Sequence, residues 1–354
     1  MREGIRNSEF GIRKGAAAAV VGLVAVFALL VPYMFSPFYT GLFTQALVFG
    51  LLALSVGLLG GYLGLMPLGH AALMGVAAYG LGFFIVHVHS PMGAAVGLAL
   101  LVTLAVALVF GLMAVRTTGV FFTMITLAQG MLVWGGAFKW YAVTGAENGL
   151  RGIVRPAFAA SYWEFYYLTL LVFALCWAVL WLIVRSPLGL SLQGIRESES
   201  RMRTLGFNIT AHKLLAFLIS GFFAGVSGVL FGWYNNFISP GSVGLQASAD
   251  AVLMVIIGGS GTLLGPVIGA AIIVFIKNIL SIYVARWPTI MGLIFIAVIL
   301  FAREGLVGLA RNIITRRRTN ETPNLAGLNG ERGARDGGLR APAASGGIER
   351  ISPG

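Results

Sequence analysis

The side chains that could do chemistry in this chain are few and scattered. Ser260 stands in Gly258-Gly259-Ser260-Gly261, a glycine-rich setting in which a serine can act as a nucleophile. A nucleophilic serine needs a positioned base such as histidine, and no histidine follows His212. We therefore predict no catalytic residue, and the chain is not expected to be an enzyme.

Ionisable groups inside apolar runs are functional candidates by default, and their scarcity here argues against an ion-driven pump. Asp250 is expected near a helix start, and His70 is expected to cap a span through a backbone bond, with a substrate contact as the alternative for each. Lys277 is expected to reach the membrane surface or to pair with a neighbouring subunit. His87 and His89 have no nearby cysteine or carboxylate, so no metal site is predicted.

Residues 185–213 form a polar, charged segment inside an otherwise apolar sequence. Between 193 and 206 the charges alternate in sign at helical spacing, and a glycine follows where a helix would end. The pattern predicts a short helix that docks on a partner, with a solvated face carrying ordinary ion pairs as the alternative. The predicted docking residues are Arg196, Glu197, Glu199, Arg201 and Gly206.

Composition places the chain among polytopic membrane proteins, because 58% of its residues are hydrophobic, 10% are charged and its mean hydropathy is +0.90. The formal net charge of +12 could suggest a nucleic-acid partner. Basic residues gather beside spans and in the tail, however, as they do on the cytoplasmic side of membrane proteins, so nucleic acid is not expected. The single cysteine, Cys176, lies in an apolar run and is expected to pack in the core.

Apolar runs of suitable length predict an all-α transmembrane bundle of about ten spans. The runs are 16–35, 42–61, 71–88, 93–115, 120–138, 166–184, 214–233, 244–259, 267–284 and 289–301. Residues 1–15 would precede the transmembrane domain at 16–303, and residues 304–354 form a basic tail too poor in large apolar residues to fold.

Basic residues before the first run, in 185–213 and after the last run place both termini and the charged segment in the cytoplasm. Lys139, Arg151 and Arg155 conflict with this orientation, because the loop that carries them would then lie outside.

Two glycine- and proline-rich stretches break the apolar runs. Non-helical backbone at membrane depth is tolerated only where it is buried in protein or lines a wet cavity, and interrupted segments in two halves of a chain point to a transport site. Tight turns between spans are the alternative. The residues are Gly60, Gly61, Gly64, Pro67 and Gly69 in the first stretch, and Gly258, Gly259, Ser260, Gly261, Gly265 and Pro266 in the second.

A polar stripe marks the fifth predicted span. Thr123, Thr126 and Gln129 recur every three residues and therefore share one helix face. The stripe is a candidate lining of the pathway, and hydrogen bonding between helices is an equal alternative.

Several motifs follow one another in order between residues 42 and 309. They are Gly60-Gly61-Tyr62-Leu63-Gly64, Leu68-Gly69-His70-Ala71-Ala72, Val143-Thr144-Gly145-Ala146-Glu147-Asn148-Gly149-Leu150, Ile195-Arg196-Glu197, Glu199, Leu205-Gly206, Lys213-Leu214-Leu215-Ala216-Phe217, Ser239-Pro240 and residues 255–269. Together they resemble one family, the LivM-type permease subunits of ATP-binding-cassette importers for branched-chain amino acids. One departure is Met66-Pro67, where the family usually carries a polar residue and a serine.

The resemblance implies a permease in the bacterial inner membrane that works by alternating access, with residues 195–206 as the helix that couples it to an ATPase. It also implies a second homologous permease, two cytoplasmic ATPase subunits and an extracytoplasmic substrate-binding protein. A P-loop needs Gly-Lys-Ser/Thr, and no lysine here follows a glycine. ATP and Mg are therefore expected on the partner subunits, with no cofactor bound directly.

Other functions fit parts of the pattern. Permeases for urea or short amides look similar throughout, and an autonomous ion-coupled carrier or channel would need neither an ATPase nor the charged segment. Gly258-Gly259-Ser260-Gly261 also resembles the Gly-x-Ser-Gly of rhomboid intramembrane proteases, but that pattern requires a later histidine.

Overall fold

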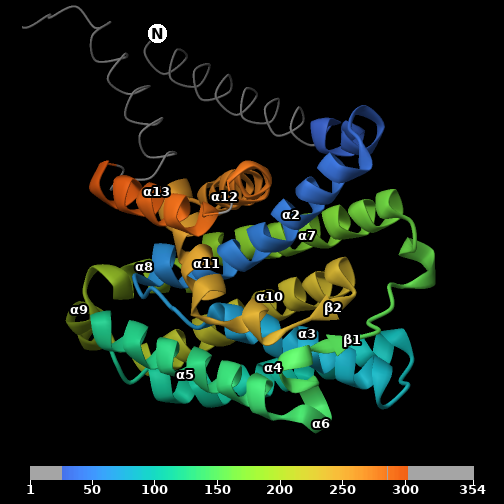
Figure 1. The fold of residues 1–354 in the computed structure, drawn as a ribbon. Coiled ribbons are helices and arrows are strands. Elements are labelled where there is room, and N and C mark those ends of the chain that lie inside the picture. The colour runs from blue at the N-terminus through green and yellow to red at the C-terminus, as the bar shows by residue number, and fades with distance from the viewer. Residues whose placement is uncertain (1–25, 285, 302–354) are drawn as a thin grey trace, which may run out of the picture. The chain divides into compact units, whose positions relative to one another are not determined.

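The structure is a computed structural model that describes residues 26–284 and 286–301, and most of these residues are helical (Figure 1). The predicted N-terminal segment 1–15 and tail 304–354 lie outside the described residues. A helical stretch over 26–34 precedes the labelled elements. The first labelled elements are α2 (Pro37–Gly57), the π-helix η1 (Leu58–Leu63), α3 (His70–Val86), α4 (Met92–Ala114), α5 (Gly119–Lys139), α6 (Tyr141–Thr144), η2 (Ala146–Asn148), β1 (Leu150–Arg151), η3 (Ala157–Ala159) and α7 (Tyr162–Arg185). The others are α8 (Pro187–Glu197), α9 (Glu199–Thr204), α10 (Ile209–Asn235), β2 (Phe237–Ile238), η4 (Pro240–Val243), α11 (Leu245–Gly258), α12 (Leu264–Tyr283) and α13 (Trp287–Phe301).

Within the described ranges, six helices are long and apolar enough to cross a membrane: α2 continued by η1, α4, α5, α7, α10 and α12. The predicted number of about ten spans is not confirmed. The helices α3 and α11 are apolar but shorter, because a non-helical or irregular segment, 64–69 or 236–244, precedes each of them. Part of the predicted span 16–35 lies outside the described residues.

The helices α2 and α10 form the centre of the bundle. α2 packs against α7, α10 and α12, while α10 also packs against α3 and α4. Small residues permit close approach, as in membrane bundles generally: a side chain at Gly228 of α10 would meet the Met74 backbone of α3, and one at Gly269 of α12 would meet the Met254 backbone of α11. The outer helices α4, α5 and α7 instead expose large apolar side chains, which suits contact with lipid or with a partner subunit.

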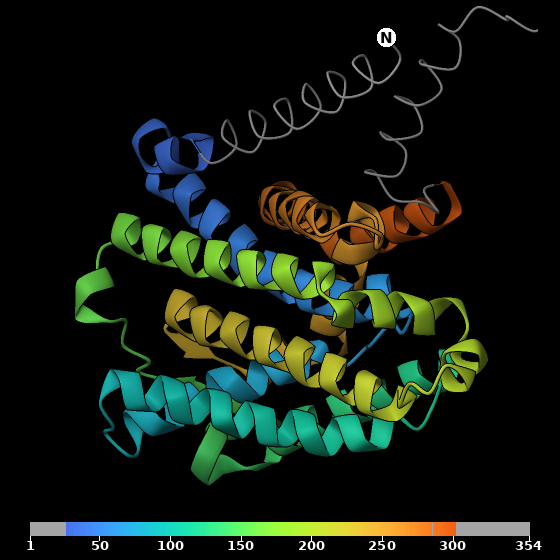
Figure 2. The ribbon, with the colours of Figure 1, turned by 180° about the vertical axis from the view of Figure 1, so that it is seen from behind.

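The two ends of the bundle differ in character. The charged helices α8 and α9 lie at one end, and the small sheet of β1 and β2 lies at the other, as both views show (Figures 1 and 2). The two strands are antiparallel and pair Leu150 with Ile238 and Arg151 with Phe237. They join the loop before α7 to the segment that follows α10.

Arg155 explains part of the basic charge in the loop that the predicted orientation places outside. Its Nε and Nη2 atoms each donate a hydrogen bond of 2.8 Å, to the carbonyl oxygens of Trp233 and Tyr234 at the end of α10. The guanidinium also lies 4.7 Å from the centre of the Phe165 ring. A cation that binds the last carbonyls of a helix satisfies them and complements the helix dipole. Burial lowers the pKa of Arg155, but an arginine stays charged at neutral pH.

We expect Arg155→Ala to lower the free energy of unfolding by about 2 kcal/mol, because two carbonyls at the end of α10 lose their donors. Thermal unfolding of the purified chain in mild detergent would measure the loss.

Arg151→Ala is the matched control. Arg151 lies in β1, just before this loop, and is exposed, and its guanidinium lies 5.6 Å from the centre of the Phe237 ring. Equal unfolding midpoints for the two variants would contradict the capping role.

Candidate functional site

The charged segment predicted as one short helix forms two helices, α8 and α9. Ser198 lies between them in an extended conformation, with φ −163° and ψ 104°, and its hydroxyl accepts a hydrogen bond of 3.3 Å from the Arg201 backbone N–H. Serine is a preferred N-cap because it supplies this acceptor, so it ends one helix and begins the next. The predicted stop at Gly206 is confirmed: its φ is +86°, and the Phe207 N–H reaches back to the Met202 carbonyl.

Arg196 connects α8 to the end of α2. Its Nη1 atom donates a hydrogen bond to the carbonyl oxygen of Gly61 in η1, and its side-chain stem packs over Gly64. Gly64 has φ +78°, a left-handed conformation that favours glycine, and a side chain there would also meet Arg196. Arg196 makes this contact within its own chain while its side chain remains exposed, and its docking on a partner stays a prediction.

Glu199 connects α9 to α10. Its carboxylate lies 2.5 Å from the Nζ atom of Lys213, whose side chain is only 3% exposed. A buried ammonium requires a partner, so this ion pair holds α9 against the first turns of α10. Like Arg196, Glu199 makes its visible contact within the chain.

A different set of side chains points away from the bundle. Glu197 and Arg201 are exposed, while Leu205 is 66% exposed and Phe207 40% exposed at the end of α9. These four residues, which we call the docking face, combine charge with exposed apolar surface at the polar end of the molecule. Such a surface is typical of a protein interface.

The non-helical part of the first stretch, residues 64–69, packs against α5 and is mostly buried or half-buried. The Thr123 hydroxyl donates to the Met66 carbonyl at 2.9 Å, and the Leu68 N–H donates to the Thr126 hydroxyl at 3.1 Å. A side chain at Gly69 would overlap the Thr126 carbonyl, so glycine allows the two backbones to approach. Two threonines of α5 thus satisfy backbone groups that no helix serves.

His70 begins α3 at this junction, where α2, α3 and α10 meet. Its Nε2 atom lies 2.6 Å from the Ser220 hydroxyl, which itself donates to the Ser55 carbonyl at 2.6 Å. Because a hydroxyl has one proton, Ser220 must accept from His70, whose Nε2 is protonated. Ser220 lies about 16 Å along α10 from its first residue, at 1.5 Å per residue, so α3 begins deep in the bundle. The predicted backbone cap at His70 is wrong.

The polar stripe of α5 joins elements of the bundle. Besides the two threonine contacts, the Gln129 side chain donates to the Phe110 carbonyl of α4 at 3.0 Å. Thr126 and Gln129 are buried. In this conformation the geometry matches the alternative of hydrogen bonding between helices.

The second predicted stretch, 258–266, is a tight turn that connects α11 to α12. The Gly265 N–H donates to the Thr262 hydroxyl at 3.0 Å, and the backbones of Gly258 and Gly265 are in contact. Gly259 has φ +101°. A side chain at Gly61 would overlap the Ser260 carbonyl, so this turn lies directly against η1.

A second interruption that sequence reasoning missed lies at 236–244, between α10 and α11. It contains β2 and η4, and η4 packs against α3, α5 and α11. A side chain at Gly75 of α3 would overlap Val243, and Gly244 lies beside Trp134 of α5. The signal was Ser239-Pro240-Gly241, a combination typical of turns. The two interruptions therefore lie along opposite halves of α5.

Asp250 and Lys277 form an ion pair between α11 and α12. Lys277 Nζ lies 3.0 Å from Asp250 Oδ2, and the Gln246 amide donates to the other carboxylate oxygen at 3.3 Å. Asp250 lies five residues after Leu245, the first residue of α11, so it is neither the N-cap nor in the first turn, and the expected position near the helix start is wrong. The pair neutralises a buried carboxylate.

Sequence comparisons with known proteins identify relatives of this chain. A sequence model of the family described as "Branched-chain amino acid transport system / permease component" matches residues 38–303. The chain is 26% identical over 322 residues to the high-affinity branched-chain amino acid transport system permease protein LivM of Salmonella typhimurium, a match that covers 81% of this chain and 74% of that protein. LivM of Escherichia coli is 25% identical over 327 residues, which cover 82% of this chain and 75% of that protein. The autoinducer 2 import system permease protein LsrC of Klebsiella pneumoniae is 30% identical over 191 residues, which cover 51% of this chain and 53% of that protein.

We expect Thr126→Val to lower the free energy of unfolding by about 1 kcal/mol, because the Leu68 N–H loses its acceptor in a buried setting. The substitution preserves side-chain shape, so the loss reports the hydrogen bond to the interrupted segment. The midpoint of thermal unfolding in detergent would measure it.

Thr103→Val separates this effect from the loss of any buried hydroxyl. Thr103 is equally buried, and its hydroxyl donates to the Ala99 carbonyl within its own helix. A loss of stability in Thr103→Val as large as that in Thr126→Val would argue against a special role for the contact with Leu68.

Proposed function

Because the chain belongs to the family of branched-chain amino acid transport system permease components, we propose that it is the membrane-spanning permease of an ATP-driven importer for branched-chain or other aliphatic amino acids. The LivM relatives support this substrate class, since each match covers more than four fifths of the chain, whereas the match to LsrC covers 51%. The family includes proteins with other substrates, so competition among substrates belongs in any uptake assay.

The docking face is the observation that carries the proposal. Its apolar residues Leu205 and Phe207 are exposed at the end of the bundle that carries α8 and α9, which the proposed orientation places outside the lipid tails. A cytoplasmic ATPase subunit would bury them in a cleft and supply the ATP and Mg sites. The complete importer would contain two such ATPases, a second homologous permease and an extracytoplasmic substrate-binding protein.

One charge-assisted hydrogen bond and one ion pair connect the helices of the docking face to the membrane-spanning part. Arg196 bonds the Gly61 carbonyl in η1, and Glu199 holds Lys213 at the start of α10. Movement of α8 and α9 would therefore pull directly on the ends of α2 and α10. A polar cavity of about 350 Å³ beside Gly61, Gln193 and Gly261 leaves space for such movement.

The pathway would open around α5, because both interrupted segments lie along it. The segment 64–69 follows η1 directly, so a pull through Arg196 reaches the threonine contacts on α5. Rearrangement of these few hydrogen bonds would expose a low-affinity route first to one side and then to the other, as alternating access requires. The π-helical turn η1 is a suitable hinge, since such turns are frequent at functional sites.

The orientation follows from the same assignment. The end of the bundle that carries α8 and α9 would face the cytoplasm of a bacterial cell, together with both termini, and the β1–β2 end would face outward. Arg155 then serves the end of α10 on the outer side.

We expect the chain, purified from its native membrane, to bring P-loop ATPases and a second permease with it. In vesicles that contain the binding protein, this complex should take up labelled leucine only when ATP is supplied, and a proton ionophore should not stop the uptake. Leu205→Asp should lose the ATPases and the uptake while its unfolding midpoint is unchanged, because the side chain is mostly exposed.

Thr210→Asp is the matched control, since Thr210 is exposed on α10 just beyond α9 and receives the same charge. Uptake that continues without ATP and collapses with the ionophore would favour an autonomous carrier. Competition by urea rather than by leucine, isoleucine or valine would move the assignment to urea and short amides.

Glu199→Lys should abolish uptake while the chain remains in the membrane, because it places two ammonium groups together at a buried position. Exchanging the charges, as Glu199→Lys with Lys213→Glu, should restore part of the uptake if the ion pair transmits motion within the chain. Normal uptake in the single variant would refute the coupling role. No recovery in the double variant would indicate that Glu199 acts by contacting the partner subunit rather than through Lys213.

A further inference from the structure

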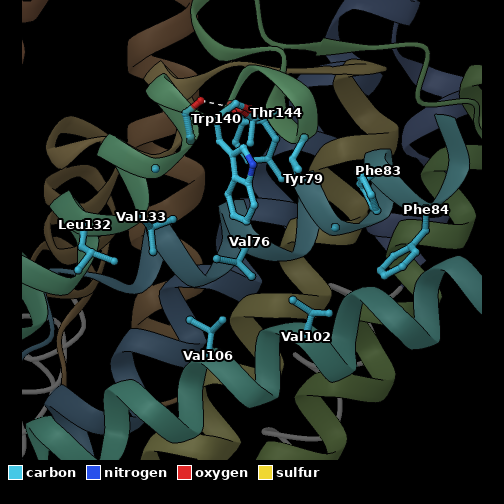
Figure 3. A pocket seen from close by; sticks show the side chains of 14 residues that line it. Val76, Tyr79, Phe83, Phe84, Val102, Val106, Leu132, Val133, Trp140 and Thr144 are labelled. Carbon is cyan, nitrogen blue, oxygen red and sulfur yellow. Dashed lines mark hydrogen bonds between the residues drawn. The ribbon is translucent and has the colours of Figure 1, made fainter. Parts of the chain in front are cut away.

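A large apolar pocket lies between α3, α4, α5 and α6, apart from the docking face and from both interrupted segments. Its volume is about 560 Å³, within the range of ligand pockets in proteins, roughly 300–1,000 Å³. Valine side chains from α3 and α4 line one end, and Tyr79, Trp140 and Thr144 meet at the other (Figure 3). The pocket is therefore apolar along its length with hydroxyl groups at one end.

The pocket opens on a surface that is itself apolar. Two of its lining residues, Val102 of α4 and Leu132 of α5, are also exposed on the outside of the bundle. On α5, Gly136 lies between Leu132 and Trp140, which is at the hydroxyl-bearing end of the pocket. A side chain built at Gly136 would meet nothing within 4 Å. A long, flexible apolar molecule could thus enter sideways, between α4 and α5.

Tyr79 supplies an independent sign of a ligand. The residue is 6% exposed and its hydroxyl is buried without a hydrogen-bond partner among the described residues. A buried polar group without a partner costs about 1–3 kcal/mol. Thr144 lies at the same end of the pocket, but no hydrogen bond joins its hydroxyl to that of Tyr79. The hydroxyl oxygen has less than 1 Å² of accessible surface in this conformation, so an acceptor that arrives with a ligand would bond it after the Tyr79 side chain rotates toward the pocket.

The side chains that line the pocket indicate which class of ligand it would bind. Among the described residues, none that lines the pocket is charged, so the ammonium and carboxylate of an amino acid would have no partners there. A phospholipid fits better, because its acyl chain needs only apolar walls and its ester carbonyl is an acceptor near the headgroup. Trp140, Tyr141 and the exposed Lys139 mark the polar end of the pocket as the interfacial level of the membrane, where ester groups lie and where a lysine suits a phosphate.

We propose that this pocket binds one acyl chain of a membrane phospholipid, whose ester carbonyl accepts a hydrogen bond from Tyr79. The lipid would wedge between α4 and α5 and pack on α3, the helix that follows the first interruption. This site is independent of the proposed transport function.

A phospholipid that carries a photoactivatable diazirine in its acyl chain tests the proposal. The full chain, with the chains that co-purify, is placed in vesicles that contain this lipid, irradiated and digested. We expect labelled peptides from 76–84 and 132–144. Gly136→Leu should lose this labelling because its side chain fills the pocket, and Tyr79→Phe should reduce it about fivefold, the effect of one hydrogen bond.

Gly135→Leu is the matched control. Gly135 is the preceding residue of the same helix, a side chain there also meets nothing within 4 Å, and it does not line the pocket. This variant should keep full labelling. Equal labelling of Gly136→Leu and wild type would overturn the proposal, as would protection by leucine, which would indicate a substrate site, or a cross-link from this surface to a protein chain, which would indicate a subunit interface.

Discussion

Backbone polar groups buried in an apolar layer must find partners inside the protein, because neither lipid nor water can serve them there. This constraint shapes the region around α5. The segment 64–69 leaves the helical ladder of η1, and its exposed carbonyl and N–H groups are taken up by Thr123 and Thr126. Once these hydrogen bonds are made, α3 can begin deep in the bundle at His70 rather than at a membrane surface. The helix is short for that reason.

The same constraint leaves the segment 64–69 held by few hydrogen bonds, so a shift of its neighbours would displace it more easily than it would bend a continuous helix. A continuous helix resists bending because each backbone bond lies within it, but an interrupted segment is held by a few side chains from a neighbour. Arg196 bonds the Gly61 carbonyl immediately before this segment, and the α11–α12 turn touches Gly61 from the other side. The charged helices and the interruption thus form one contiguous set of contacts, through which the proposed coupling between them would pass.

At the opposite end of the bundle, the last carbonyl groups of α10 have no partner within the helix and need donors from elsewhere in the chain. Arg155 binds them from the loop before α7, and the β1–β2 pair holds that loop beside the second interruption. Lys277 plays a comparable part within the apolar layer, since it neutralises Asp250 across α11 and α12. Arg155, Lys213 and Lys277, whose charges look anomalous in a membrane protein, therefore have partners within this chain, and the docking face and the apolar pocket are among the surfaces left for other molecules.

The sequence by itself determined the class of the protein, because hydropathy and composition are properties of residues and need no folded context. It also determined the positions of most apolar helices, the irregular backbone around Gly64 and the helix stop at Gly206, since these depend on local conformational preferences. Only the tertiary structure decided that Arg196 and Glu199 face their own chain, that residues 258–266 make a turn, and that the second interruption lies at 236–244. Only the tertiary structure showed that Thr123 and Thr126 of α5 hydrogen-bond the backbone of the segment 64–69. These outcomes depend on which distant residues meet, and residue types and spacing along one helix do not encode the position of a partner that is more than fifty residues away in the chain.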